Sequence, residues 1–213
     1  MQTTILKELL EEKLQQASRF ISLKPMGVQS LQGCLMNVTK KNIEITTTNL
    51  NDFYKTKIPT KAKKTGVVIF DIKKVVEFLH FLPPGEITLS SKESTLEIMQ
   101  NKTKGSFSLF NVEEFPDIPE AGGKEDVLRK EILEKLHMVL FSASKDETRP
   151  VLTGTMLSEG KKEGMNIVST DGFRLSLLTV PSKKGKVHII VPATILSEVI
   201  KMSEGRKCRY STI

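Results

Sequence analysis

Few residues in this sequence have the types and spacing that metal or redox chemistry requires. His80, His137 and His188 stand far apart, with no HxxxH pair and no paired carboxylate, so they form no metal-ligand pattern. Cys34 and Cys208 lack CxxC spacing and lie in strand-like segments. We expect them to be reduced, partly buried thiols rather than a disulfide or a metal site.

Patterns for nucleotide binding and for nucleophilic catalysis are missing as well. Neither GxxxxGK[ST] nor GxGxxG occurs in the sequence. The acidic pairs Glu11-Glu12 and Glu113-Glu114 have no Ser/His or Cys/His arrangement beside them. We therefore expect no cofactor, no metal and no catalytic residue, and a binding or scaffolding protein rather than an enzyme. A site assembled from distant residues stays open as an alternative.

The sequence contains more basic than acidic residues. Lys and Arg number 32 against 25 Asp and Glu, which gives a formal net charge of +7. Such an excess favours a polyanionic partner such as DNA, RNA or an acidic membrane surface. A lysine-rich surface without a specific partner is the alternative that composition leaves open.

Length and hydropathy indicate a folded protein of two domains. The chain has 213 residues, 38% of them hydrophobic and 27% charged, which suits two domains of ordinary size. No apolar run approaches the roughly 20 residues of a membrane span, and the first ten residues lack a signal-peptide pattern, so we expect a cytoplasmic protein. Prolines and glycines in residues 116–124 predict a linker between domains of residues 1–120 and 121–213.

Apolar residues at helical spacing predict four amphipathic helices. They run from Leu6 to Ile21, from Ile72 to Leu79, from Ile132 to Leu140 and from Ile195 to Ile200. Strand-like runs fill the sequence between them: residues 31–38, 42–48, 53–58, 67–70, 86–89, 95–99, 106–110, 151–157, 165–170, 173–180, 187–191 and 207–211. This order of elements predicts an α+β fold.

The second half of the chain repeats the first. Gly33 corresponds to Gly154, the pair Lys40-Lys41 to Lys161-Lys162, and Thr48-Asn49 to Thr170-Asp171. Because helix, glycine, lysine pair and turn recur in one order, we expect similar helix-plus-sheet units. Asp171-Gly172 between two strand-like runs predicts a hairpin with a type I′ turn, of which Asn49-Leu50 is a weaker copy.

Three motifs resemble a known family. Residues 141–154 (FSASKDETRPVLTG) and residues 168–176 (VSTDGFRLS) are similar to two stretches of the central domain of bacterial replicative sliding clamps, the beta subunits of DNA polymerase III. Phe173 stands where that family usually has His. Residues 107–109 (FSL), followed by 114–116 (EFP), are similar to the end of the clamps' first domain. The resemblance covers the whole chain.

The resemblance implies a DNA-clamp fold of repeated helix-plus-antiparallel-sheet units, two per domain, with the helices toward a central channel. It implies a homodimeric ring, of which this chain would hold the first domain, most of the second and none of the third. Such a processivity factor encircles duplex DNA without sequence specificity. It tethers the DNA polymerase III alpha subunit, other polymerases and clamp-loader subunits, and it needs no membrane partner.

The resemblance also implies two sets of site residues. The expected DNA-binding residues lie at or near basic positions of the family: Lys24, Lys73, Lys74, Arg149 and Lys201. The expected peptide pocket takes residues from the second domain: Leu152, Thr170, Gly172, Phe173, Arg174 and Leu175. An ordinary solvated charge or hairpin residue is the alternative for each.

The chain departs from the family pattern at both sets. Ala193-Thr194 replaces the often basic start of the fourth helix, which is why Lys201 is included, and Pro150-Val151 replaces aromatic residues of some clamps. Phe173 in place of His puts the shape of the pocket in doubt.

Two other classes of protein remain as alternatives. A nucleic-acid-modifying enzyme with its catalytic part elsewhere would use this region to hold DNA, but no catalytic motif supports it. A membrane-surface protein would need an amphipathic helix with a basic face and bulky aromatics opposite, which the sequence lacks.

Overall fold

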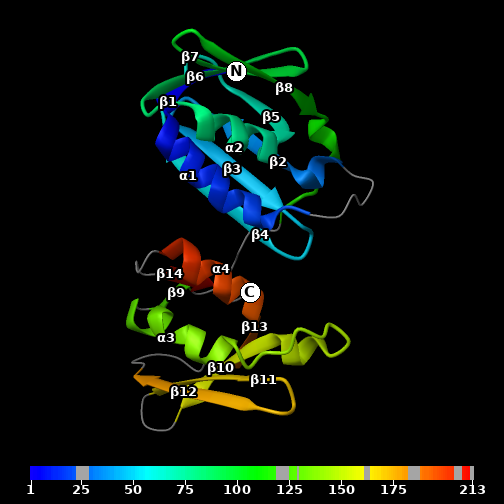
Figure 1. Ribbon diagram of the computed structural model, residues 1–213, viewed down its shortest axis with the longest axis vertical. Coiled ribbons are helices and arrows are strands. Elements are labelled where there is room, and N and C mark those ends of the chain that lie inside the picture. Colours follow the sequence, from blue (N-terminus) through cyan, green and yellow to red (C-terminus); the bar gives the residue numbers. More distant parts are fainter. Residues whose placement is uncertain are drawn as a thin grey trace. The chain divides into compact units, whose positions relative to one another are not determined.

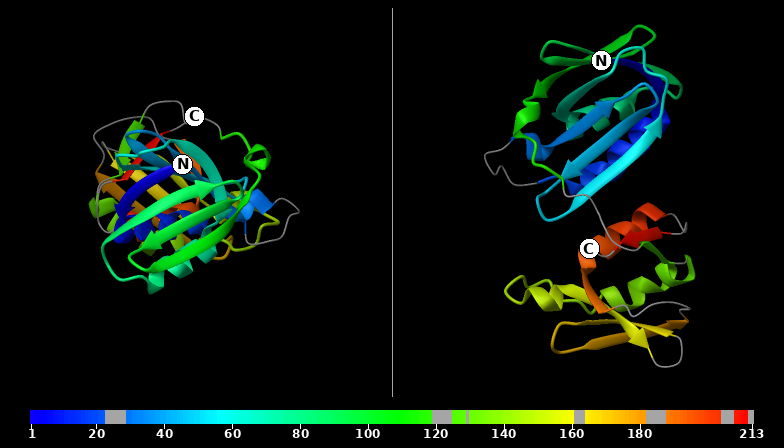
Figure 2. Two further views of the ribbon diagram at one scale, coloured as in Figure 1. Left: turned by 90° about the horizontal axis from the view of Figure 1, so that it is seen from above. Right: turned by 180° about the vertical axis from the view of Figure 1, so that it is seen from behind.

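The structure, a computed structural model, describes residues 1–22, 29–118, 125–128, 130–160, 164–181, 188–203 and 208–211. It divides into two compact units, Met1–Pro119 and Glu120–Ile213. Both are built from helices and antiparallel strands (Figures 1 and 2), which confirms the predicted α+β class.

The first unit contains two copies of one arrangement, a strand, a helix and three further strands. The first copy has the elements β1 (Gln2–Leu6), α1 (Lys7–Ala17), β2 (Gly33–Val38), β3 (Asn42–Thr48) and β4 (Phe53–Pro59). The second copy has the elements β5 (Gly66–Asp71), α2 (Ile72–Phe81), β6 (Glu86–Lys92), β7 (Thr95–Gln100) and β8 (Thr103–Phe110). Short 3-10 turns are η1 (Ser18–Phe20), η2 (Gln29–Gln32) and η3 (Val112–Glu114).

The first strand of each copy pairs with a strand of the other copy. The eight strands form one antiparallel sheet in the order β1-β6-β7-β8-β5-β2-β3-β4. Thus β1 pairs with β6, and β5 pairs with β2. The sheet curls around α1 and α2, which lie side by side (Figure 1).

The core of this unit lies between the two helices and the sheet. Leu10 and Leu14 of α1 and Val75 and Leu79 of α2 are buried at helical spacing. Alternate residues of the strands meet them from the sheet: Met36, Val38, Ile43, Ile45, Ile87, Leu89, Leu96 and Ile98. The core therefore joins both copies into one body.

The second unit repeats the arrangement. Its elements are β9 (Glu125–Leu128), α3 (Lys130–Leu140), the 3-10 turn η4 (Pro150–Thr153), β10 (Gly154–Gly160), β11 (Gly164–Thr170), β12 (Leu175–Pro181), β13 (His188–Pro192), α4 (Ala193–Ser203) and β14 (Cys208–Ser211). One sheet has the order β12-β11-β10-β13, and β14 pairs with β9. The exchange of first strands recurs, since β9 and β13 pair as β1 and β5 do. The residues that form its core come from both helices and the sheet: Leu133, Leu136, Leu157, Ile167 and Leu196.

The four predicted helices are confirmed, with one boundary corrected. The first helix was expected to reach Ile21 but ends at Ala17, and a 3-10 turn follows it. Ile21 is buried all the same, which is why it fitted the apolar pattern. The predicted strands are present, but those predicted from residues 31, 151 and 173 begin at Gly33, Gly154 and Leu175. The strands β1 and β9 were not predicted, because QTTIL and EDVL carry no clear alternation.

The two matched glycines occupy equivalent places. Gly33 begins β2 and Gly154 begins β10. A Cβ atom at Gly33 would lie 2.6 Å from Cγ2 of Ile69, and one at Gly154 would lie 2.3 Å from Cγ2 of Ile190. Ile69 lies in β5 and Ile190 lies in β13, which are the first strands that pair with the other copy. This exchange of strands therefore requires glycine at both positions.

The loops Asn49–Asp52 and Asp171–Arg174 connect equivalent strands with equivalent hydrogen bonds. In the first loop Asn49 Oδ1 accepts from the N–H groups of Asn51 and Asp52 at 3.0 and 2.7 Å. In the second loop Asp171 Oδ1 accepts from Phe173 and Arg174, at 3.0 Å each. The hairpins are confirmed. The type I′ turn is wrong, because each loop has four residues and a side chain organises it.

One residue in each loop has a positive φ angle, Leu50 at 77° and Gly172 at 91°. The threonine before each loop accepts from that residue's N–H, Thr48 from Leu50 and Thr170 from Gly172. This conformation costs an ordinary side chain roughly 1–2 kcal/mol but costs glycine little. The first loop therefore holds strain that the second avoids.

We predict that Leu50→Gly stabilises the chain by roughly 0.5–1 kcal/mol, because relief of the positive φ exceeds the extra chain entropy of glycine. The measurement is the midpoint of urea unfolding. Leu50→Ala is the control, since alanine keeps the backbone strain while removing the same exposed side chain. An equal increase in stability in both variants would show that exposure of the Leu50 side chain, and not its φ angle, destabilises the chain.

Candidate functional site

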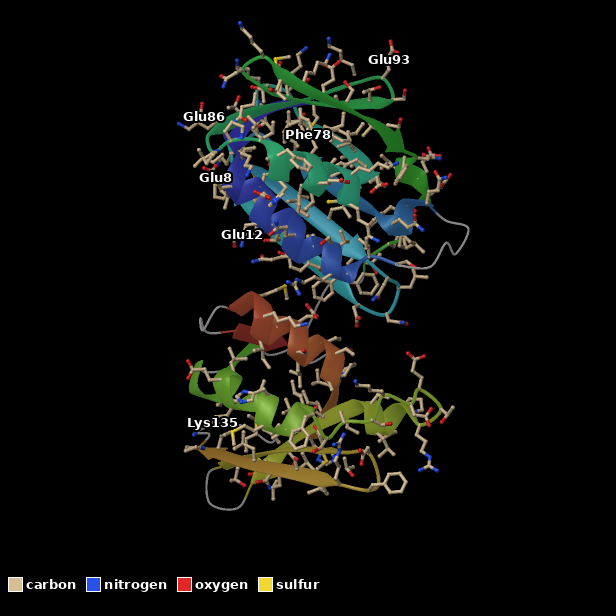
Figure 3. The ribbon with its side chains drawn as sticks, in the orientation of Figure 1. Glu8, Glu12, Phe78, Glu86, Glu93 and Lys135 are labelled. Carbon is tan, nitrogen blue, oxygen red and sulfur yellow. The ribbon has the colours of Figure 1, made fainter. Side chains whose placement is uncertain are left out.

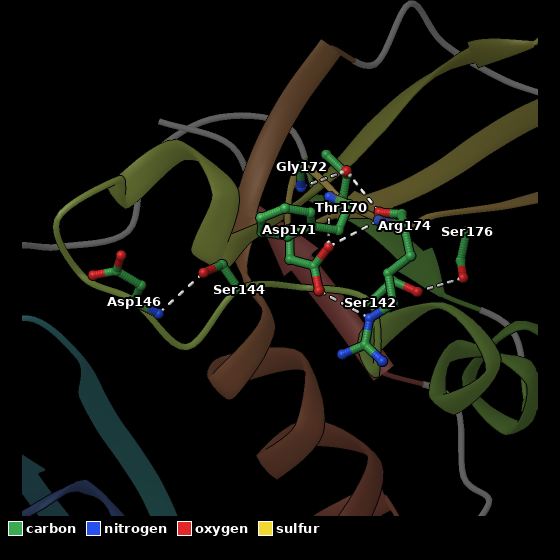
Figure 4. Close-up of polar contacts among 9 residues, drawn as sticks. Ser142, Ser144, Asp146, Thr170, Asp171, Gly172, Arg174 and Ser176 are labelled. Carbon is green, nitrogen blue, oxygen red and sulfur yellow. Dashed lines mark hydrogen bonds and ion pairs between the residues drawn. The ribbon is translucent and has the colours of Figure 1, made fainter.

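Five of the six predicted pocket residues come together in the β11–β12 hairpin. Thr170 Oγ1 donates to the carbonyl of Arg174 at 2.8 Å, and Arg174 Nε donates to Asp171 Oδ2 at 2.9 Å. Figure 4 shows Thr170, Asp171 and Arg174 turned toward one another across the loop. Phe173 and Leu175 continue from it, Leu175 pairing with Thr170 in the register of the hairpin. The loop therefore has a defined structure that is held by hydrogen bonds among its own residues.

Leu152, the sixth residue, comes from η4, which packs against β10 and β11. Its carbonyl accepts from the N–H of Ser144 at 2.9 Å, which ties η4 to the segment that follows α3. Its side chain is partly buried. Because the start of β10 pairs with the end of β11, η4 lies at the end of the sheet from which the hairpin loop extends.

Apolar side chains of the hairpin are turned to solvent. Phe173 is 100% exposed, Leu175 65% and Leu177 59%. Leu175 and Leu177 share one face of β12, which is the edge strand of its sheet. Contiguous exposed apolar groups are typical of interaction sites on soluble proteins. Leu177 was not among the predicted residues, although the alternation in Leu175-Ser176-Leu177 could have indicated it.

Two further residues, Phe141 and Ser142, contact the hairpin and were missed as site residues. Besides its bonds to Asp171, the Arg174 guanidinium lies 5.4 Å from the centre of the Phe141 ring, a distance at which the cation attracts the ring face. Ser142, next in the chain, is buried and its hydroxyl lies 2.6 Å from that of Ser176 in β12. The end of α3 therefore positions the hairpin, which no sequence spacing indicated.

The predicted DNA-binding residues lie at element ends. Lys73 and Lys74 open α2 and are exposed. Asp71 caps that helix by accepting from both of their N–H groups, at 3.1 and 3.3 Å, and its Oδ2 lies 3.5 Å from the Lys74 ammonium. Lys24 lies outside the residues that the structure describes.

The two candidates of the second unit differ in their surroundings. Arg149 immediately precedes η4 and is exposed. Lys201 lies in the last turn of α4, where its ammonium contacts Glu198 at 2.7 Å. That ion pair makes Lys201 a weaker candidate for phosphate binding than the sequence indicated.

The paired helices of the first unit are not basic as a whole. Glu8 and Glu12 project from α1 (Figure 3), and Glu11 pairs with the nearly buried Lys7 at 2.7 Å. Together α1 and α2 carry Lys7, Lys13, Lys73 and Lys74 against Glu8, Glu11, Glu12 and Glu77. The positive charge of this helix face is therefore confined to the start of α2.

A separate cavity of about 500 Å³ lies in the second unit. The residues that line it come from the end of α3, the segment after it, η4 and the first turn of α4: Leu140, Phe141, Ala143, Ser144, Lys145, Glu147, Thr153, Ala193, Thr194 and Ser197. None of the six predicted pocket residues lines it. Phe141 lines the cavity and also contacts Arg174.

The titratable groups in the described ranges include no cluster of three that could hold a metal ion. Cys34 is a free thiol that is fully buried, rather than partly buried as predicted, and burial raises its pKa. The side chain of Cys208 is not among the described ones. Within the described segments, no helix has the length and hydropathy to cross a membrane.

Comparison with known families identifies the chain. Residues 1–119 match the model of the DNA polymerase III beta subunit, N-terminal domain, and residues 126–209 match its central domain. The chain belongs to the DNA polymerase III beta subunit family. The two matches follow one another in the order of the two compact units, so the predicted resemblance and the clamp fold are confirmed.

Known clamps resemble the chain in sequence and in fold. The beta sliding clamp of Rickettsia felis is 29% identical over 173 residues, which cover 78% of this chain and 45% of the relative. A putative DNA polymerase III beta subunit from Eubacterium rectale superposes with a TM-score of 0.92 at 20% identity, over 100% of this chain and 60% of that one. The Helicobacter pylori beta clamp bound to a DNA ligase peptide has a TM-score of 0.81 at 23% identity, covering 94% and 58%.

The chain spans about half the length of the curated relatives that it matches.

We predict that the pKa of Asp171 lies below the ordinary value for aspartate, because the N–H groups of Arg174 and then Phe173 donate to its carboxylate, with a smaller contribution from the Arg174 charge. The lowered pKa means that the carboxylate supports the loop above the unfolded-state pKa, and that this support is lost as the pH falls through the folded-state value. Carbon-detected NMR titration of the Asp171 carboxyl measures it.

Arg174→Ala tests the cause of that shift. The variant keeps both backbone N–H donors, so most of the pKa depression should persist. A return of the Asp171 pKa to its ordinary value in Arg174→Ala would show that the ion pair, not the backbone, holds the loop.

Proposed function

We propose that this chain acts as part of the sliding clamp of a bacterial replicative DNA polymerase, a non-catalytic processivity factor in the cytoplasm. The observation that carries the proposal is the consecutive match of its two units to the N-terminal and central domains of the beta subunit. We assign residues 1–120 to the first clamp domain and residues 121–213 to the second, and we propose that the clamp is a homodimeric ring.

The clamp would hold duplex DNA without reading its sequence. Contacts from lysine and arginine to phosphates carry no base information, so they allow a protein to slide. Lys73 and Lys74 support this role, because both side chains are exposed at the positive N-terminal end of α2. Lys24 and Arg149 stay proposals of the same kind, and Lys201 a weaker one.

The hairpin would tether polymerases and clamp-loader subunits. Phe173, Leu175 and Leu177 give it an exposed apolar surface, and Arg174, held by Asp171 and Phe141, adds a fixed positive charge. A short partner tail with Leu and Phe side chains matches such a surface. The peptide-bound Helicobacter pylori clamp supports the idea that relatives use peptide partners.

Replacing the two lysines of α2 tests the DNA assignment. Lys73→Gln with Lys74→Gln should reduce the salt dependence of binding to a linear duplex, by about 1–2 units in the slope of log affinity against log salt, because each phosphate contact contributes about 0.9. Lys92→Gln with Lys102→Gln removes the same charge from the β6–β8 hairpins and is the control. Equal slopes in the two double variants would remove α2 from the DNA-binding surface.

Charge placed in the apolar surface tests peptide docking. The chain should bind a Leu- and Phe-containing polymerase-tail peptide weakly, in the micromolar range, and Leu175→Asp should abolish binding because docking would bury an unpaired carboxylate. Thr179→Asp adds the same charge on the same face of β12, about 13 Å farther along the strand, and should bind normally. Fluorescence anisotropy of a labelled peptide measures both. Full binding by Leu175→Asp would place the site elsewhere.

A further inference from the structure

Five exposed lysines gather at one end of the eight-stranded sheet. Lys40 and Lys41 form the β2–β3 turn, and Lys61, Lys63 and Lys64 lie in the connection from β4 to β5. We call these five residues the lysine platform. No predicted DNA-binding or pocket residue belongs to it.

Backbone hydrogen bonds hold the two segments of the lysine platform together. The N–H of Thr60 donates to the Lys41 carbonyl at 2.8 Å, and that of Ala62 to the Lys40 carbonyl at 3.3 Å. Gln2 bonds Lys64 in both directions, at 2.9 and 3.1 Å. Because Ala62 also packs against the core, the side chains of the platform project from an ordered base rather than from a loose loop.

Carboxylates do not neutralise the lysine platform. In the part of the chain that the structure describes, none of its five ammonium groups has a carboxylate partner. Glu44, the acidic residue of β3, pairs instead with Lys55 and Lys57 of β4, at 3.0 and 3.2 Å. Residues 40–64 hold seven lysines but only two acidic residues, Glu44 and Asp52. Unpaired like charges held this close create a field that attracts anions.

The lysine platform is distinct from the basic start of α2. Lys64 precedes β5 and Lys73 follows it, and the six residues of β5 separate the two by roughly 20 Å of extended chain. The α1 and α2 face carries as many glutamates as lysines, whereas the platform has no acidic member. Among the described residues of the first unit, this group of lysines therefore lies away from the α1 and α2 face.

The residue types of the platform select among polyanions. Both segments, TKK and TKAKKT, lack arginine, aromatic and large apolar side chains. Single-stranded nucleic acid is held by aromatic stacking, and acidic protein partners by arginine forks and apolar anchors. Lysines alone act as point charges for phosphates. We propose that the lysine platform binds the phosphate backbone of duplex DNA at a second surface, separate from the α1 and α2 face.

This inference rests on the proposed function only in taking DNA as the polyanion. A triple variant, K61Q/K63Q/K64Q, should lower the salt slope of binding to a linear duplex of about two helical turns by 2–3 units, at about 0.9 for each phosphate contact. The control triple K92Q/K102Q/K104Q has the same net charge. An equal decrease in both triples, or none in the first, overturns the proposal.

A positional measurement on the unmodified chain avoids any effect of the substitutions on folding. Duplex DNA should protect the five platform lysines from acetylation, as read by mass spectrometry, while Lys92 and Lys102 stay reactive. Uniform protection, or protection of Lys73 and Lys74 alone, overturns the platform and leaves the proposed clamp function standing. The converse result, platform protection without any effect of Lys73→Gln and Lys74→Gln on binding, contradicts the channel assignment instead.

Competing polyanions test the choice of partner. Poly-glutamate of matched charge and a single strand of matched length should each protect the platform less than the duplex does at one salt concentration. Stronger protection by either one would overturn duplex DNA as its ligand.

Discussion

The exchange of first strands is the constraint on which the rest of this structure depends. In the first unit β1 pairs with β6 and β5 pairs with β2, and in the second β9 pairs with β14 and β13 with β10. Each exchanged strand leads directly into a helix, so the exchange also fixes where that helix starts. Gly33 and Gly154 are the local requirement, because no Cβ fits beside the isoleucine of the incoming strand.

The two hairpin loops have the same backbone conformation and hydrogen bonds, but they expose different side chains. Asn49 and Asp171 accept from the same pair of N–H groups, and Thr48 and Thr170 make the same two bonds. The residues that project differ: Leu50 and Asp52 in the first loop correspond to Gly172 and Arg174 in the second. Hydrogen bonds of the loop's own side chains therefore preserve its shape, while the exposed positions differ in their chemistry.

Charge is distributed against the simplest expectation for a protein of this family. The helix face of the first unit balances lysine with glutamate, and its buried Lys7 is paired with Glu11. Lysines that lack a carboxylate partner lie instead on turns at the end of the sheet. There their ammonium groups can stay in water without disturbing the packing of the core. Net charge alone thus favours an anionic partner but does not indicate where that partner binds.

The local pattern of residues in the sequence determined much of the fold of this protein. Apolar spacing indicated α1 to α4, because burial of one helix face is written in nearby residues. Residues 168–176 indicated the family, and five of the six predicted pocket residues lie in the one hairpin that they form. Tertiary structure decided the rest. The strands β1 and β9, the support of Arg174 by Phe141, and the bonds of Lys41 to Thr60 and of Lys64 to Gln2 depend on backbone pairing and contacts between distant segments. Backbone hydrogen bonds are alike for every residue, so they leave no mark in the sequence that identifies their partners.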